Sequence, residues 1–360
     1  MVTQKNPAFV AVVEDATRCL GSSPALLQQI REDNTVIIGI LAGDFTSGSL
    51  AAQPAGRPRS VRAAEAIAAG CDIVLGLPTI ALTNGPDTAA FAAVSLMQRL
   101  HCLDRVVIPY HDAVLPADVQ DMQKSGSTAQ ILDKAAMQLF METPGFQKIY
   151  KGLQQKAAAS DGTDPQDLLL AAADQLVPGT LALAADPLNR AAIQLLTQVH
   201  KLYNPVRPVL MAIDPSSGAS GSETQTTPET TREYSPLIGK SFSLPELREH
   251  LQIEFKDNSI SMLYTHCPYI RVLAIREDAK QYLPYLSEHA WAGLTSDDPA
   301  IGLPDITRAD AYRADAAHAD GSQADDLRVD SSSAADGSSE VIRILARIDS
   351  RARDFHASLR

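Results

Sequence analysis

The sequence predicts an α/β protein built around a doubly wound parallel sheet. Short apolar runs rich in branched residues indicate strands that are buried on both faces. They lie at 8–14, 35–42, 71–78 and 104–110. Segments with apolar residues at helical spacing separate these runs, at 24–32, 59–70 and 87–100. Strands that alternate with helices in this way are expected to run parallel, because each helix carries the chain back across the sheet.

We expect four parts along the chain: an α/β domain, a mostly helical region that completes it and contains a flexible polar loop, a small C-terminal α+β domain, and an acidic low-complexity insertion within that last domain. The α/β domain is expected at 1–125 and the helical region at 126–250, with its loop at 214–236. The C-terminal domain is expected at 251–295 plus 340–360, and the acidic insertion at 296–339. The insertion places Asp on a five-residue period, which fits neither the helix nor the strand repeat.

Composition and charge exclude several classes of protein. The 360 residues are 45% apolar, which is enough for a substantial core. The four cysteines lack CxxC spacing and the eight histidines lack HxxxH or HxH pairs, so no structural zinc, disulfide framework or catalytic metal is expected. No apolar run approaches the roughly 18 residues of a membrane span, so we expect a soluble, cytoplasmic protein. The net charge of -12 argues against binding nucleic acid through bulk charge, and leaves a local basic face open.

Ligands of an open parallel sheet bind beyond the carboxyl ends of its strands, which directs attention to the loops that follow them. These loops are 14–23, 43–58, 76–86 and 109–113. In the first of them Gly21, Ser22 and Ser23 precede a helix, where backbone amides and hydroxyl groups can hold a phosphate. The same residues also suit an ordinary helix cap, because the full P-loop or GxGxxG spacing is absent.

Cys19 is a candidate nucleophile in the same loop. A helix end and the neighbouring Arg18 would lower the pKa of its thiol. A buried, inert cysteine is the alternative, since the sequence shows no obligate histidine partner.

Arg57, Arg59 and Arg62 form the clearest basic cluster of the first domain. They suit a grip on phosphate or RNA, and they also suit a solvated helix start. Further along, Ser243 and Glu246 have capping-box spacing and predict the start of a helix. Arg248 beside them adds a second candidate anion site.

The sequence resembles the tRNA(Met) cytidine acetate ligase family in a series of motifs. VVEDATRCLGSS resembles the family's strand and NPFHNGH loop, VIIGILAGDF its second strand and Ser-Gly-x-Phe turn, and RSVRAAEAIAAGCDIVLGLP and DTAAFAAVSLM the elements that follow. DPLNRAAIQLL is similar to its Pro-Asn-Asn helix, SLPELR to its Ser-x-x-x-Ile-Arg segment, CPYIRVLAI to its Pro-Tyr-x-Arg-Val-Leu strand and SRARDFHASL to its ending. The likeness spans most of the chain apart from 296–339.

The resemblance implies a nucleotidyltransferase-like fold of the HIGH-type Rossmann-like class and an enzyme that uses ATP with Mg²⁺ to activate acetate. Acetyl-adenylate would then donate the acetyl group to the wobble cytidine of elongator tRNA(Met). Cys19 and Ser22 stand at the positions of the family's two catalytic histidines. The positions implied to bind ATP are Val12, Val13, Glu14, Gly21, Ser22, Gly43 and Asn189, and those implied to bind RNA or phosphate are Arg59, Arg62, Arg248 and Arg271.

Several family positions carry other residues here, and a second hypothesis follows from them. Both histidines of the loop are replaced, and the losses fall on cationic or hydrogen-bonding side chains, whereas turn glycines and apolar periodicity persist. Preorganised donors supply much of the rate in such reactions. The alternative to an acetate ligase is therefore a catalytically degenerate paralogue that binds a nucleotide, RNA or a protein partner without adenylating anything.

Overall fold

The computed structural model describes the residues that carry the fold. They are 7–14, 20–43, 45–47, 51–54, 57–83, 85–100, 102–112, 127–157, 164–201, 206–213, 242–253, 270–286, 290–292, 345 and 347–359. The loop expected at 214–236 and the insertion expected at 296–339 lie outside them, and so does Cys19.

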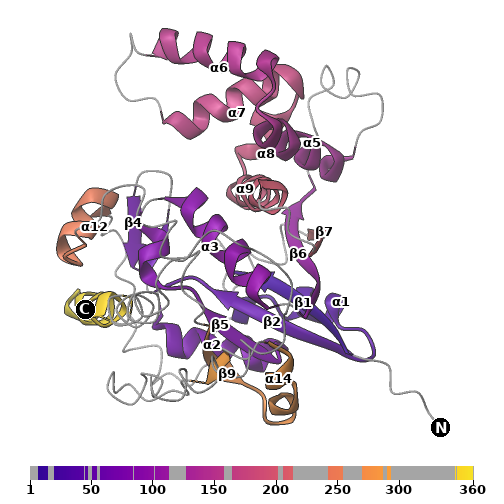
Figure 1. Cartoon of the computed structure of the whole chain (residues 1–360), viewed down its shortest axis with the longest axis vertical. Coiled ribbons are helices and arrows are strands. Elements are labelled where there is room, and N and C mark those ends of the chain that lie inside the picture. The colour runs from indigo at the N-terminus through magenta and orange to yellow at the C-terminus, as the bar shows by residue number, and fades with distance from the viewer. Residues whose placement is uncertain are drawn as a thin grey trace, which may run out of the picture.

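The apolar runs of the first domain form the centre of one sheet (Figure 1). They become β1 (Ala8–Val13), β2 (Thr35–Leu41), β5 (Ile73–Gly76) and β6 (Leu103–His111). Together with β7 (Arg207–Ile213) they run parallel in the order β5-β2-β1-β6-β7. The chain thus winds outward from β1 in one direction through β2 and β5, and afterwards in the other direction through β6 and β7. The predicted α/β fold with a doubly wound parallel sheet is confirmed.

Two strands from the last quarter of the chain extend this sheet beyond β5. β9 (Ile270–Ile275) runs antiparallel to β5, and β10 (Ala290–Ala292) runs parallel to β9. β9 is followed by η3 (Glu277–Tyr282) and α14 (Leu283–Leu286). The domain boundaries expected from the sequence stay a prediction.

Helices cover both faces of the sheet because strand side chains alternate between them. On one face Val10, Val12 and Ile37 share a core with α1 (Pro24–Ile30) and α2 (Arg59–Ala69). On the other face Ala11 and Ile38 share a core with α3 (Pro86–Arg99) and α9 (Pro187–Lys201). These helices lie where the sequence predicts them.

A further layer of helices lies beyond α9, at the end of the molecule away from β5 and β9 (Figure 1). It consists of α5 (Thr128–Met141), α6 (Pro144–Ala157), α7 (Pro165–Leu176) and α8 (Thr180–Ala184). α5 packs on α9, and Phe146 of α6 is buried against Ala172 and Ala173 of α7. No helix in the described part of the chain is long and apolar enough to cross a membrane.

A second, small antiparallel sheet forms where the sequence suggests only a loop between 43 and 58. It contains β3 (Phe45–Ser47), β4 (Ala51–Pro54) and β8 (Phe242–Ser243), which brings together segments far apart in the chain. α12 (Leu244–His250) starts directly after β8, and its capping box pairs Ser243 with Glu246. The predicted helix start is therefore confirmed.

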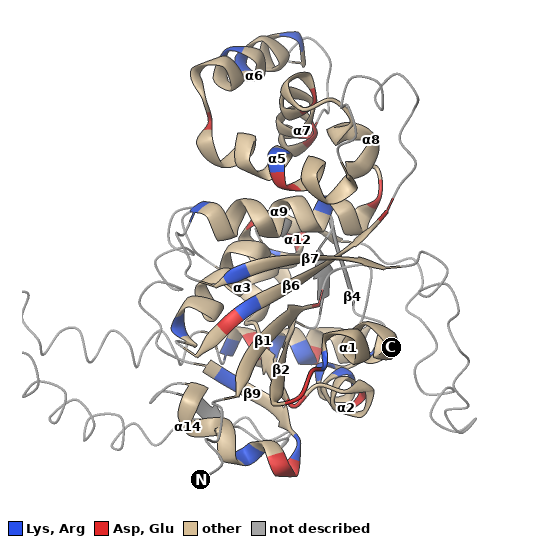
Figure 2. Cartoon of the chain, turned by 90° about the vertical axis from the view of Figure 1, so that its right-hand side faces the viewer, with Lys and Arg blue, Asp and Glu red and all other residues tan. Residues whose placement is uncertain are grey.

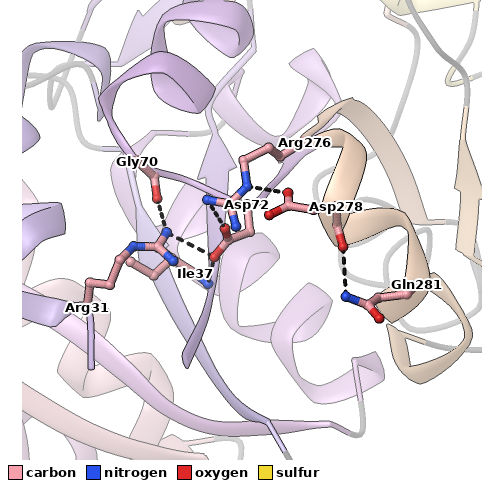
Figure 3. A network of polar contacts seen from close by, with 7 residues as sticks. All are labelled: Arg31, Ile37, Gly70, Asp72, Arg276, Asp278 and Gln281. Atoms are coloured by element: carbon pink, nitrogen blue, oxygen red, sulfur yellow. Dashed lines mark hydrogen bonds and ion pairs between the residues drawn. The ribbon is translucent and has the colours of Figure 1, made fainter. Parts of the chain in front are cut away.

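Asp72 ties three strands together at the amino edge of the sheet (Figure 3). Its Oδ2 atom accepts a hydrogen bond of 2.7 Å from the amide of Ile37 in β2 and one of 3.0 Å from Arg31. Its Oδ1 atom lies 2.7 Å from the guanidinium of Arg276, which follows β9. Asp72 is buried, so the charges of Arg31 and Arg276 compensate a carboxylate that would otherwise be an unpaired buried charge.

Candidate functional site

The opposite, carboxyl edge of the sheet is where a doubly wound fold binds its ligands, at the point where the strand order reverses. Here that point lies between β1 and β6. Val12 pairs in register with Val107, so β6 continues to His111 well beyond the last residue of β1. Residues after β1, β2 and β6 therefore surround the end of β1.

Glu14, the first residue after β1, is buried and paired with Arg62 of α2. Its amide donates to the carbonyl of Ile40 at 2.8 Å, and its carboxylate accepts from the amide of Ala42 at 3.2 Å and from the guanidinium of Arg62. Arg62 also donates to the carbonyl of Gly43. The two side chains are only 2% and 3% exposed. The structure thus joins Glu14, Gly43 and Arg62 in one cluster in which the negative and positive charges balance.

The two glycines expected at the nucleotide site lie in close packing contacts. A Cβ atom on Gly43 would lie 2.9 Å from Oγ1 and 3.0 Å from Cα of Thr79, in η2 (Thr79–Leu82). A Cβ atom on Gly21, in η1 (Leu20–Ser22), would lie 2.6 Å from Cβ of Glu65 in α2. Packing alone therefore accounts for a glycine at both positions, and their contact with ATP stays a prediction.

The other residues of the expected ATP and catalytic sets lie as follows. Val12 is fully buried within the sheet and Val13 packs against its core. The backbone of Ser22 closes η1 just before α1, whereas Cys19 lies outside the described residues. The catalytic roles expected for Cys19 and Ser22 stay predictions.

Two of the arginines expected to hold RNA or phosphate meet on one carboxylate. Arg271 of β9 donates to Oδ2 of Asp349 at 3.1 Å, and Arg59 at the start of α2 lies 3.5 Å from the same oxygen. Oδ1 of Asp349 accepts from the amide of Thr79 at 2.8 Å. Asp349 belongs to the helix at 347–358, so this cluster fastens the C-terminal helix to α2, β9 and η2.

Arg248 of α12 also makes a contact within the chain, because its Nε donates to the carbonyl of Thr83 at 2.9 Å. All four arginines of the expected RNA or phosphate set are thus engaged in the fold: Arg59, Arg62, Arg248 and Arg271. Binding of an external anion by them stays a prediction.

Asn189 of α9 connects the second half of the chain to the end of β6. Its side chain is buried, accepts from the amide of His111 at 2.9 Å and donates to the carbonyl of His111 at 3.1 Å. The position expected from the sequence is therefore at the carboxyl edge, with both of its polar atoms fixing the main chain of His111.

Sequence reasoning missed the pair formed by His111 and Asp186. Nδ1 of His111 lies 2.8 Å from Oδ2 of Asp186, while Oδ1 of Asp186 caps α9 by accepting from the amides of Leu188 at 2.8 Å and Asn189 at 3.1 Å. Burial opposes ionisation of Asp186, but hydrogen bonds from His111 and from these amides outweigh it and hold its pKa below the ordinary value. A histidine at the end of a predicted strand and an aspartate just before a Pro-started helix were the available signals.

The two described cysteines are poor nucleophiles. Burial, followed by the charge of Asp72, raises the pKa of Cys71 to about 12, and burial with the charge of Asp104 raises that of Cys102 to about 12. Among the described residues no group of three or more His, Cys, Asp and Glu side chains is arranged to hold a metal ion.

With this geometry in place, comparison with solved structures finds Thermotoga maritima TmcAL. Its structure bound with alpha-thio ATP matches with a TM-score of 0.56 and 14% identity, over 98% of this chain and 94% of that chain. Its apo structure matches with a TM-score of 0.58 and 14% identity, over 98% and 95%. The likeness shows the fold. No protein-family model and no curated protein matches the sequence.

Proposed function

We propose that this chain binds ATP at the carboxyl edge of its parallel sheet, between the ends of β1 and β6. The observation that carries the proposal is the likeness to TmcAL over nearly the whole length of both chains, because one of the matching TmcAL structures is bound with alpha-thio ATP. The location is supported by the switch in strand order at β1.

The described residues fit a nucleotide in part. His111 lies at the end of β6, where an imidazole can contact phosphate groups, whereas Arg62 is already balanced by Glu14. Mg²⁺ is held mainly by the phosphates of its nucleotide and by waters, so it does not require a cage of protein carboxylates. It would enter with ATP.

The finer proposal is an ATP-dependent ligase of the tRNA(Met) cytidine acetate ligase type, which would use acetate and elongator tRNA(Met). The sequence landmarks and the likeness to TmcAL support it. We place the RNA contact on α6, which exposes Lys148, Lys151 and Lys156 and contains no acidic residue. Its ribbon carries the colour of basic residues in Figure 2. Clustered lysines of this kind are what phosphate contacts require.

A second candidate is binding without adenylation. It is favoured by the intrachain partners of Arg59, Arg62, Arg248 and Arg271, which leave few cations near the sheet edge to stabilise a leaving pyrophosphate.

Pyrophosphate exchange separates the two candidates. A ligase catalyses acetate-dependent exchange of labelled pyrophosphate into ATP, and a binding-only protein shows a thermal shift with MgATP but no exchange. If neither exchange nor a shift occurs at millimolar ATP, the nucleotide proposal is contradicted. A Lys148→Gln, Lys151→Gln, Lys156→Gln triple variant tests the RNA surface, because it should weaken tRNA binding and leave the ATP-induced shift unchanged.

A further inference from the structure

The imidazole of His111 is held on one side and lacks a partner on the other. Nδ1 lies 2.8 Å from Asp186, whereas Nε2 is buried and has no hydrogen-bond partner in the described part of the chain. Buried polar atoms in proteins are normally hydrogen-bonded, so an exception indicates strain, an unseen partner or a ligand contact. The position of His111 at the carboxyl edge favours the last of these.

The ring is fixed before any ligand arrives. Asn189 holds the main chain of His111 through two hydrogen bonds, of 2.9 and 3.1 Å. Asp186 holds the ring and is itself held by the amides of Leu188 and Asn189. One short segment, the start of α9, thus sets both the backbone and the side chain of His111, which is the rigid support that a binding group requires.

The hydrogen bond to Asp186 also assigns the proton. An ionised carboxylate only accepts hydrogen bonds, so the hydrogen of this contact lies on Nδ1 and Nε2 is the nitrogen left for another partner. The next residue, Asp112, accepts from the hydroxyl of Thr128, and the neighbour of His111 on β7 is the apolar Ile213. Asp186 is the acidic side chain in direct contact with the ring, and Asp112 adds a second negative charge one residue further along the chain.

We propose that His111 is a phosphate-contacting residue of the nucleotide site, in which protonated Nε2 donates to a phosphoryl oxygen of the bound triphosphate. Asp186 is the positioning residue that holds Nδ1. This inference rests on the proposed binding of ATP at the same edge. The protonated imidazole gives that edge a cation, because the guanidinium of Arg62 is already paired with Glu14.

The chain offers a matched control in its other described His–Asp pair. His200, in the last turn of α9, has Nε2 3.5 Å from Asp133, and this nitrogen is likewise buried without a hydrogen-bond partner in the described part of the chain. The side chains of His111 and His200 are each 20% exposed, and both contact an aspartate. Removing His200 therefore removes a histidine of the same exposure that also lies beside an aspartate, but away from the end of β6.

The experiment measures the affinity for ATP and for inorganic triphosphate by titration calorimetry for the full chain, His111→Gln, Asp186→Asn and His200→Gln. Loss of one charge-assisted hydrogen bond predicts about 10- to 100-fold weaker ATP binding for His111→Gln. A similar loss should appear with inorganic triphosphate, which carries the phosphate groups without the nucleoside. Asp186→Asn still caps α9, and it should weaken binding of both ligands, whereas His200→Gln should behave as wild type.

Each outcome decides the proposal. If wild type binds ATP and His111→Gln binds ATP and inorganic triphosphate equally well, the role of His111 is overturned and the proposed function stands. If wild type binds neither ATP nor inorganic triphosphate, both are overturned together. If His111→Gln fails to fold, an unchanged affinity of Asp186→Asn for ATP and inorganic triphosphate overturns the proposal and a weaker affinity for both supports it.

Discussion

Glu14 and Arg62, which are 48 positions apart in the sequence, form a buried ion pair where β1, β2 and α2 meet. The carboxylate also accepts from the amide of Ala42, and the guanidinium also donates to the carbonyl of Gly43. Glu14, which the resemblance implies to bind ATP, therefore contacts Arg62, which it implies to bind RNA or phosphate. The ion pair between them contributes to the stability of the carboxyl edge.

Replacing one partner of this pair should destabilise the fold strongly. Glu14→Gln leaves a buried guanidinium uncompensated, and the free energy of unfolding should fall by about 3 to 5 kcal/mol. Urea denaturation followed by circular dichroism measures it. Arg57→Gln is the control, because Arg57 pairs with Glu65 at the surface and should cost at most about 1 kcal/mol. Equal losses for both variants would contradict the structural role of Glu14.

Arg271 and Asp349 allow a stability role to be distinguished from RNA binding. Asp349→Ala removes the carboxylate that Arg59, Arg271 and the amide of Thr79 share, so the C-terminal helix should detach more readily from β9. We expect a loss of about 2 kcal/mol or more and faster proteolysis near 347–358. If Arg271→Gln weakens tRNA binding without lowering stability, the arginine acts on RNA and this account of it is wrong.

Asp87, in the first turn of α3, should destabilise the protein at neutral pH. Burial raises the pKa of its carboxyl above the ordinary value, and the charge of Asp164 adds to this, while Gln166 and Lys201 oppose it. When an acid has a higher pKa in the folded state than in the unfolded state, the folded protein loses stability as the pH rises from the unfolded pKa, near 4, through the folded pKa. Asp87→Asn should therefore be more stable than wild type at pH 7, and the gain should vanish as the pH falls toward 4. Melting temperatures across this range test it, and a variant less stable at pH 7 would contradict it.

Thiol alkylation should separate the described cysteines from Cys19. With pKa values of about 12, Cys71 and Cys102 carry thiolate at only about one part in ten thousand at pH 8. Iodoacetamide at pH 8 should leave both unmodified in the folded protein and modify both in urea, as read by mass spectrometry. Rapid modification of Cys19 under native conditions would support its predicted low pKa, and rapid modification of Cys71 would contradict the burial described above.

The central strands were predictable because each is a short, doubly buried apolar run with its own helix beside it. β9 is a run of the same kind, but its antiparallel place beside β5 depends on a partner about 200 residues earlier in the chain, which no local pattern specifies. β3 and β4 lack an alternating pattern and are held by pairing with each other and with β8. Their formation depends on tertiary contacts.

The candidate site was predictable to the extent that strand ends and helix starts define the carboxyl edge. Glu14, Gly43 and Asn189 do lie at that edge. The pairing of Glu14 with Arg62 and of His111 with Asp186 was not predictable, because each joins residues that only the completed sheet brings together. Residue type alone marked the arginines as anion sites, and only the structure shows that carboxylates and carbonyls of the chain contact them.

Hydrogen exchange with and without MgATP tests the central claim most directly, because one measurement reports both binding and location. The account predicts that ATP slows exchange in peptides covering 12–14, 41–43, 108–112 and 186–190, which meet at the carboxyl edge. Peptides around Asp72, at the amino edge, should exchange equally in both states. Protection confined to other regions, or no protection at millimolar ATP, would contradict a nucleotide site at the ends of β1 and β6.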